Sequence, residues 1–193
     1  MKEKVILKAY EYAMTQDLES ISLVKISNDL EISRRSLYRI FKDKYELMFE
    51  VYKIIIDELL IEAHTLNEKN FERDGYHQTL QAMNNMIKVF LENSKKIKYI
   101  TKFDALNIDD NDLLKEKNDF YRKCDFTYGF LVKGVEDGSV KSSVEPYKVS
   151  CVILETIIGL VSRFHDVDKE EYTDYMEKED IYSIIDVYAS YLR

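Results

Sequence analysis

Three arginines lie close together near the start of the 193-residue sequence, among residue types that bind polyanions. Arg34, Arg35 and Arg39 fall within residues 33–44, where five basic residues accompany one acid. A guanidinium is permanently charged and donates paired hydrogen bonds to phosphates or to base edges. Ser36 and Tyr38 add hydroxyl groups that also contact phosphates. These residue types at this spacing indicate nucleic-acid binding, although a charge run is more commonly a solvated helix face.

The charge distribution supports a basic head on an acidic body. The whole chain carries a net charge of −8, which by itself argues against a nucleic-acid partner. Residues 1–53 hold 10 basic and 9 acidic residues, however, so their net charge is +1 and the remainder carries −9. The acidic excess therefore lies outside the region that contains the arginines.

Short helices must position these arginines. Apolar spacing predicts a first helix over residues 2–16. Ser22 is expected to cap a short second helix, and Ser33 a third helix whose Leu37 and Phe41 face inward while the arginines face outward. Three short helices joined by tight turns, with the third one basic and rich in Ser and Tyr, form the arrangement that a DNA-reading helix-turn-helix requires.

The rest of the chain also predicts helices, so the fold class is all-α. With 5 Gly and 1 Pro, the chain has too few turn residues for a β-sandwich or barrel. Asp43 is expected to cap a long fourth helix over residues 44–66, Gly138 to follow a helix end and Pro146 to begin a helix. About nine helices are expected in total, the later ones over residues 76–93, 96–106, 112–137, 147–164 and 181–192.

Residues 21–47, ISLVKISNDLEISRRSLYRIFKDKYEL, resemble the DNA-binding signature of the TetR family of bacterial transcription regulators. The most specific part is the pair Leu37-Tyr38, followed by Phe41 three residues after the tyrosine and Lys44 three residues later. The resemblance implies a three-helix DNA-binding domain over residues 1–46, joined by a long helix to a helical ligand-binding and dimerisation domain over residues 47–193. It also implies a sequence-specific regulator, with repression relieved by a small molecule as the expected mode.

The resemblance assigns DNA contacts position by position. Arg34, Arg35, Ser36 and Arg39 match positions that read bases or adjacent phosphates, and the other matched positions hold the phosphate backbone or begin a helix beside it. The full predicted set is Ser22, Leu23, Ser33, Arg34, Arg35, Ser36, Tyr38, Arg39 and Lys44. Three residues depart from the family pattern. Glu31 replaces the usual turn glycine, at a cost of about 1 kcal/mol if the turn is left-handed. Asp17, which lies outside the residues that the structure describes, replaces a common glycine after the first helix, and Arg35 replaces a usually small residue.

Aromatic residues in the body predict a pocket for a mainly apolar or aromatic small molecule, although aromatics at helical spacing are also typical of plain core. The candidate lining residues are Phe90, Tyr99, Phe103, Phe120, Tyr121 and Tyr128.

The last two predicted helices carry more apolar residues than one packing seam needs, which predicts a homodimer through a four-helix bundle. Gly159 would permit close approach there. The candidate interface residues are Val149, Val152, Ile153, Ile157, Leu160, Val161, Ile184, Ile185, Tyr188 and Leu192.

No sequence motif indicates catalysis. There is no nucleophile elbow, no glycine-rich phosphate loop and no metal-ligand spacing, so we expect neither an enzyme nor a bound cofactor or metal. The two cysteines, Cys124 and Cys151, show no paired spacing, and no segment reads as a secretion signal or a membrane span, so a cytoplasmic protein is expected.

The expected partner is palindromic double-stranded DNA. A helical enzyme or protein-interaction module whose basic patch binds another anionic partner remains the alternative, and steep salt dependence would distinguish DNA binding from it.

Overall fold

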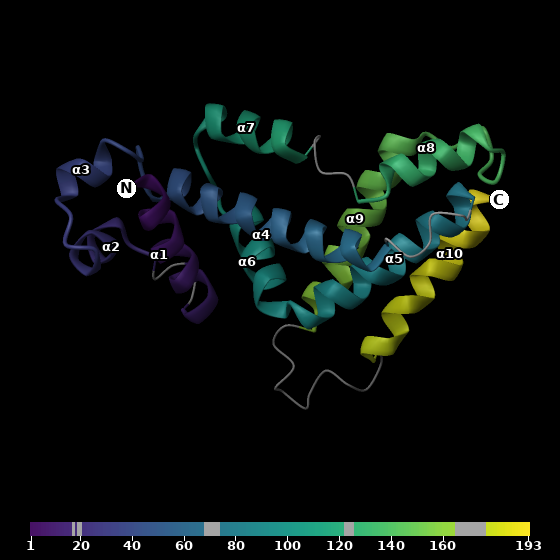
Figure 1. The fold of residues 1–193 in the computed structure, drawn as a ribbon, viewed down its shortest axis with the longest axis horizontal. Helices are drawn as coiled ribbons and strands as arrows, with labels where there is room; N and C mark the ends of the chain where they lie inside the picture. The colour runs from purple at the N-terminus through teal and green to yellow at the C-terminus, as the bar shows by residue number, and fades with distance from the viewer. Residues whose placement is uncertain (17, 19–20, 68–73, 122–125, 165–176) are drawn as a thin grey trace. The chain divides into compact units, whose positions relative to one another are not determined.

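The computed structural model describes residues 1–16, 18, 21–67, 74–121, 126–164 and 177–193. This part of the chain contains ten α-helices and one 3-10 helix and no strand, which confirms the all-α prediction (Figure 1). In chain order they are α1 (Lys2–Thr15), α2 (Leu23–Asp29), α3 (Arg34–Tyr38), α4 (Lys44–Asn67), α5 (Gly75–Glu92), α6 (Ser94–Asp104), α7 (Asn111–Tyr121), α8 (Tyr128–Glu136), α9 (Pro146–Ser162), the 3-10 helix Lys178–Tyr182 and α10 (Ser183–Leu192).

The single helix predicted over residues 112–137 is instead two helices, α7 and α8. Thr127, immediately before α8, has φ −135° and ψ −8°, outside the helical region. Its buried hydroxyl donates a hydrogen bond to Ser150 Oγ in α9 at 2.9 Å. The apolar periodicity continues through this segment and does not reveal the backbone change at Thr127, whose side chain bonds to α9 instead of capping α8.

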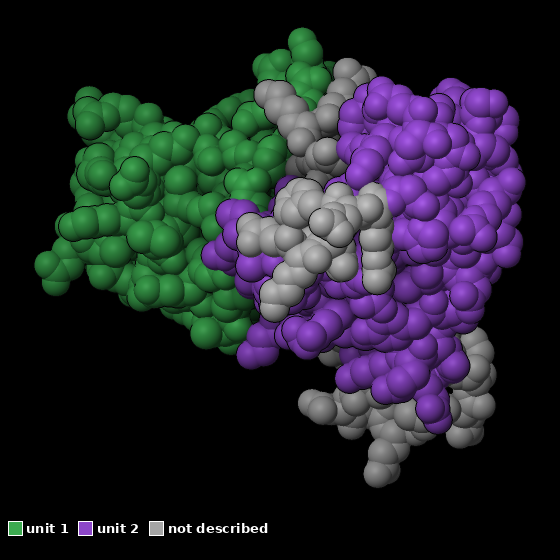
Figure 2. Space-filling model, turned by 45° about the vertical axis from the view of Figure 1, so that its right-hand side comes forward, with its two compact units in different colours: residues 1–57, 98–123 green, residues 58–97, 124–193 purple. Residues whose placement is uncertain are grey.

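The chain divides into two compact units. Unit 1 comprises residues 1–57 and 98–123, and unit 2 comprises residues 58–97 and 124–193 (Figure 2, green and purple). Helix α4 contributes residues to both units. Unit 1 therefore contains the predicted DNA-binding helices together with the end of α6 and all described residues of α7. The functional boundary expected after residue 46 stays a prediction, because the units are defined by packing.

The core of unit 1 holds the three N-terminal helices together. Helix α1 packs on α2, and α2 packs on α3. Val5, Ala9, Ile26, Leu37 and Phe41 are all completely buried. Burying a side chain of this kind contributes about 1.5 to 3 kcal/mol for each large residue. The two inward-facing residues predicted for the third helix, at positions 37 and 41, are thus confirmed.

A second part of the unit 1 core is aromatic. Phe49 and Tyr52 of α4 contact Phe103 of α6, with ring centroids 6.2 and 5.1 Å apart. Tyr99 also stacks on Phe103, with centroids 6.5 Å apart, and Phe120 of α7 meets Phe49 edge to face at 6.2 Å. Such ring pairs add about 0.5 to 1.5 kcal/mol beyond the area they bury. The cluster joins α4, α6 and α7 within unit 1.

Unit 2 is built around α5, which packs against α8, α9 and α10. The contact with α8 is unusually close. A Cβ atom added to Gly75 would lie 2.0 Å from the backbone nitrogen of Gly134. Only glycine permits the two backbones to approach in this way.

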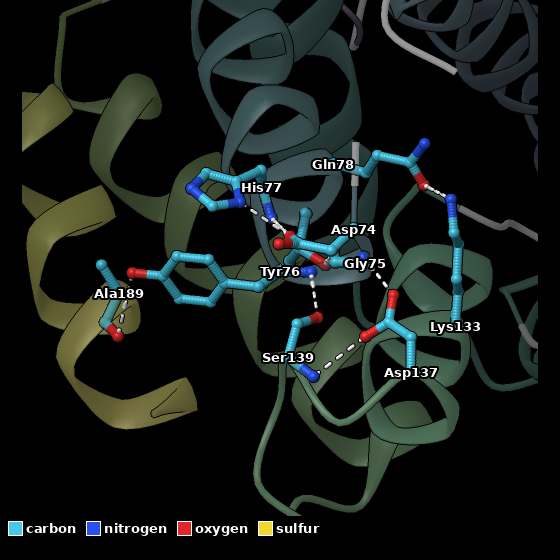
Figure 3. A network of polar contacts seen from close by, with 10 residues as sticks. Asp74, Gly75, Tyr76, His77, Gln78, Lys133, Asp137, Ser139 and Ala189 are labelled. Atoms are coloured by element: carbon cyan, nitrogen blue, oxygen red, sulfur yellow. Dashed lines mark hydrogen bonds and ion pairs between the residues drawn. The ribbon is translucent and has the colours of Figure 1, made fainter. Parts of the chain in front are cut away.

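Polar groups satisfy the first turn of α5, whose amides have no partners within the helix (Figure 3). The Gly75 amide donates to Asp137 Oδ2 at 2.9 Å, and the Tyr76 amide donates to Ser139 Oγ at 3.0 Å. Asp74, the N-cap residue, accepts from the third amide of the helix at 2.9 Å. The start of α5 is therefore anchored to the segment that follows α8.

Candidate DNA-binding surface

The turn between α2 and α3 has the backbone geometry expected of a helix-turn-helix. Leu30 closes α2, and the Glu31 amide donates to the carbonyl of Asn28 at 3.1 Å. The Ile32 amide donates to the carbonyl of Ser27 at 3.0 Å. Glu31 has φ 53°, the left-handed conformation that favours glycine, and it is the one described non-glycine residue with positive φ. The left-handed turn considered for this position is confirmed.

Helix α3 is short, and both of its faces are defined. Ser33 is the N-cap, and its Oγ accepts from the Ser36 amide at 3.1 Å, as predicted. The Ser33 and Ser36 hydroxyls lie 2.8 Å apart. Leu37 and Phe41 are completely buried, so rotation of the helix about its axis would expose apolar area. The opposite face is thereby fixed toward solvent.

The exposed face carries three guanidinium groups. Arg34, Arg35 and Arg39 are all exposed, and none forms an ion pair with a described residue. Several other cations in unit 1 are paired, for example Lys2 with Glu50 at 2.7 Å. Arginines without an internal partner keep all their donors available for a ligand. The structure brings these predicted contacts together on one surface.

The start of α4 supplies the remaining predicted contacts on this side. Asp43 Oδ1 accepts from the amide of Glu46 at 3.0 Å, which confirms the predicted cap. Glu46 Oε2 in return accepts from the Lys42 amide at 2.6 Å. Lys44 Nζ lies 5.2 Å from the centroid of the Tyr45 ring. Tyr38 is 53% exposed. Of the two predicted phosphate-binding residues, Tyr38 is therefore exposed and Lys44 is half-buried.

Ser22 and Leu23 stand at the start of α2, as predicted. Ser22 is the N-cap residue, but its Oγ accepts no capping hydrogen bond from the helix, and its hydroxyl group can donate to a phosphate oxygen. The Leu23 side chain is buried. Any contact that Leu23 makes with a phosphate therefore has to come from its backbone amide.

One contact of this surface has no counterpart in the sequence reasoning. Lys42 Nζ lies 2.6 Å from Asp110 Oδ2, immediately before α7, and the two residues are 68 positions apart. Similarly, Lys53 Nζ contacts Glu116 Oε1 of α7 at 3.0 Å. No local pattern links such distant residues, and only coupled variation between positions would have indicated them.

The predicted pocket residues fall into two groups. Tyr99, Phe103 and Phe120 belong to the aromatic cluster of unit 1, and the Tyr99 hydroxyl donates to the Met48 carbonyl at 2.8 Å. Phe120 also lines an open depression with charged residues of α7 and Lys53.

The other members belong to unit 2 or lie outside the described side chains. Phe90 is fully buried against Phe126, with centroids 5.8 Å apart. Tyr128 is 42% exposed and meets Tyr147 edge to face. The side chain of Tyr121 is outside the described set. The structure thus gathers three of the six residues in one cluster.

The predicted interface residues divide by exposure. Inside the chain's own core lie Val149, Ile153, Ile157, Val161 and Leu192. Half-buried side chains are Leu160, Ile184, Ile185 and Tyr188, and Val152 is 55% exposed. The sequence reasoning did not include Val187 and Tyr191 of α10, which are 61% and 47% exposed.

Other candidate chemistry is sparse. In the described ranges, no group of three or more His, Cys, Asp or Glu side chains is placed to hold a metal ion. Cys151 is an exposed free thiol, and Cys124 lies outside the described residues. Among the helices described, none combines the length and apolar character needed to span a bilayer.

Solved structures with a similar fold include bacterial transcription regulators. FadR from Bacillus subtilis, in complex with stearoyl-CoA, has a TM-score of 0.66 at 14% identity, covering 100% of this chain and 97% of that one. A TetR-family regulatory protein from Rhodococcus has a TM-score of 0.66 at 12% identity over 99% and 96% of the two chains. The TetR-family regulator PfmR from Thermus thermophilus gives 0.58 at 17% identity over 96% and 97%. No protein-family model and no curated protein sequence matches the chain.

Proposed function

We propose that this chain, which has the fold of TetR-family transcription regulators, is a sequence-specific DNA-binding regulator. The observation that carries the proposal is the outward face of α3, where Arg34, Arg35 and Arg39 are exposed without internal ion pairs. Leu37 and Phe41 bury the opposite side, so the three side chains are presented together.

This arrangement suits the major groove of duplex DNA. The groove admits one α-helix, and an arginine bonds the O6 and N7 atoms of guanine with two parallel hydrogen bonds. In the proposal, Arg34, Arg35 and Arg39 read bases or adjacent phosphates. Tyr38 and Lys44 hold the phosphate backbone and fix the register of the helix.

Selection from randomised duplex DNA tests the proposal and yields the operator sequence in the same experiment. The purified protein should enrich an inverted repeat, because a two-fold dimer presents two copies of α3. Tyr38→Phe and Lys44→Ala should weaken the binding of selected and random DNA by similar factors, as phosphate contacts do. Recovery of no common sequence, together with salt-insensitive binding of DNA, would favour the alternative of an enzyme or interaction module that binds another anion.

We also propose a homodimer through α9 and α10. Exposed Val152, Val187 and Tyr191, with half-buried Leu160 and Tyr188, provide apolar surface on these two helices. Thr156 Oγ1 of α9 and the Tyr188 hydroxyl of α10 are 3.4 Å apart, so the two helices meet at this point. Gly159 adds a flat position, since no atom lies within 4 Å of where its Cβ would be.

Light scattering with one charged substitution tests this interface. Val187→Glu should convert a dimer into monomers at micromolar concentration, because a buried unpaired carboxylate is strongly unfavourable at an apolar interface. Ile61→Glu is the matched control, since Ile61 is 66% exposed on α4. A wild-type monomer, or a dimer that both variants leave intact, would contradict the proposal.

Finally, we propose that the regulator is a repressor released by an apolar or aromatic small molecule bound in the body. A tenfold loss of DNA affinity requires only about 1.4 kcal/mol of coupling between the two sites. A ligand at the unit 1 cluster would have to separate the rings of Tyr99, Phe103 and Phe120. The structure of FadR with stearoyl-CoA makes acyl-CoA thioesters the first compounds to screen. A thermal-shift screen followed by a DNA-release assay is decisive, and ligands that bind without changing DNA affinity would refute release.

A further inference from the structure

The ion pair between Lys42 and Asp110 couples the DNA-binding region to the segment before α7 within unit 1. Their charged atoms, Nζ and Oδ2, are 2.6 Å apart. Lys42 belongs to the basic stretch of residues 33–44, between the recognition helix and α4. Arg34, Arg35 and Arg39 of the same stretch form no ion pair with a described residue. Lys42 is therefore the cation of this stretch that is already neutralised.

Asp110 is held firmly in place. Its Oδ1 atom accepts hydrogen bonds from the amides of Asp112 at 3.0 Å and Leu113 at 3.2 Å, so the carboxylate caps α7. Its Oδ2 atom is left for Lys42. The hydrogen bond from Lys42, followed by that from the Leu113 amide, lowers the pKa of Asp110 from its ordinary value. The carboxylate is thus charged at neutral pH.

Lys42 has a fixed backbone and a movable side chain. Its amide donates to Glu46 Oε2 at 2.6 Å, which ties the backbone to the first turn of α4. Its side chain is 71% exposed and can rotate to another anion. A phosphate of DNA would bind the same ammonium group that Asp110 now holds.

We propose that Asp110 withholds Lys42 from the DNA phosphates, so that the segment before α7 lowers the DNA affinity of the head. The proposal rests on the DNA-binding function proposed above. Any rearrangement that carries Asp110 away from Lys42 adds one phosphate contact without changing the recognition helix. The acid is therefore an autoinhibitory residue.

The expected size of the effect follows from counterion release. Each phosphate contact changes the slope of log K against log salt concentration by about −0.9. If one additional contact adds nothing to the affinity at 1 M salt, it strengthens binding about eightfold at 0.1 M salt. Asp110→Asn should therefore steepen the slope by about 0.9 and tighten binding by up to that factor. Asparagine also caps helices well, so α7 should persist in the variant.

Fluorescence anisotropy with a random-sequence duplex, measured over a range of salt concentrations, tests the proposal. Asp109→Asn is the matched control, because it removes the same charge from an exposed residue that makes no ion pair with a described residue. Lys42→Gln should change the wild-type affinity by less than about twofold, since the contact is withheld. In the Lys42→Gln background, Asp110→Asn should no longer steepen the slope. Circular dichroism checks the folding of each variant, and Asp110→Ser, which can also cap α7, is the second test of the same position.

The possible outcomes distinguish a failure of the proposed DNA-binding function from a failure of the proposed role of Asp110. If wild-type protein shows no salt-dependent DNA binding, the proposed function fails. If it binds DNA but Asp110→Asn matches Asp109→Asn, only the withheld contact is overturned. A large loss of affinity in Lys42→Gln would also overturn it, because Lys42 would then already contact DNA in the wild-type complex.

Discussion

Replacing Glu31 by glycine should stabilise the protein. Glu31 follows the C-cap of α2 with φ 53°, and its side chain is exposed, so the replacement removes little packing. A residue with a Cβ atom loses about 1 to 2 kcal/mol in the left-handed conformation. Glycine avoids this loss but gives up about 0.4 to 1 kcal/mol through the greater entropy of its unfolded chain. The expected net gain is about 0.5 to 1 kcal/mol, or roughly 2 °C in Tm for a chain of this length.

Urea unfolding followed by circular dichroism measures this gain, and hydrogen exchange of the peptides that cover α2 and α3 localises it to unit 1. Glu31→Ala keeps the Cβ atom and should give no gain. Gly138→Ala is the converse change, because Gly138 has φ 77° and open space around it. That variant should lose about 1 kcal/mol. If Glu31→Gly is no more stable than Glu31→Ala, the strain assigned to the turn is refuted.

Two further predictions concern the interior. Gly75→Ala should destabilise unit 2 by at least about 1 to 3 kcal/mol, because the added Cβ atom would meet the backbone of Gly134. Gly159→Ala is the control, because the space around Gly159 is open, and it should not lower the stability of the monomer in urea unfolding. Burial raises the pKa of Tyr99, which donates to the Met48 carbonyl. The phenol of Tyr99 therefore stays neutral in the folded protein, whereas it ionises near pH 10 in the unfolded chain. Its contribution to stability is fully present below that pH. As the pH rises further, the free energy of unfolding falls by up to about 1.4 kcal/mol per pH unit. Tyr99→Phe should lose about 1 kcal/mol at neutral pH and reduce the alkaline decline, and an unchanged decline would contradict the assignment.

Local features of the sequence predicted much of the fold. Ser33 and Asp43 cap their helices, and Pro146 begins α9, because each role depends on residues within one helical turn. The outward face of α3 followed from the inward spacing of Leu37 and Phe41. These predictions depended on no distant contact.

Features that depend on tertiary packing could not be predicted in the same way. The pairing of Lys42 with Asp110 joins residues 68 positions apart. Apolar periodicity identified Ile153 and Ile157 as apolar face residues, but it could not tell a surface buried within the chain from one available to a second copy. Val187 of α10, by contrast, is exposed and therefore available to a second copy.

The affinity of the protein for its selected DNA, with and without the arginines of α3, tests the central claim most directly. Replacing Arg34, Arg35 and Arg39 together by alanine should weaken binding at least about a hundredfold, since each bidentate base contact contributes about 1 to 3 kcal/mol. The control replaces exposed Lys88, Lys95 and Lys178 of unit 2, which removes the same charge from elsewhere. Anisotropy titrations should show a change of less than about threefold for the control. Equal affinities for the folded arginine variant and the wild-type protein would contradict the account.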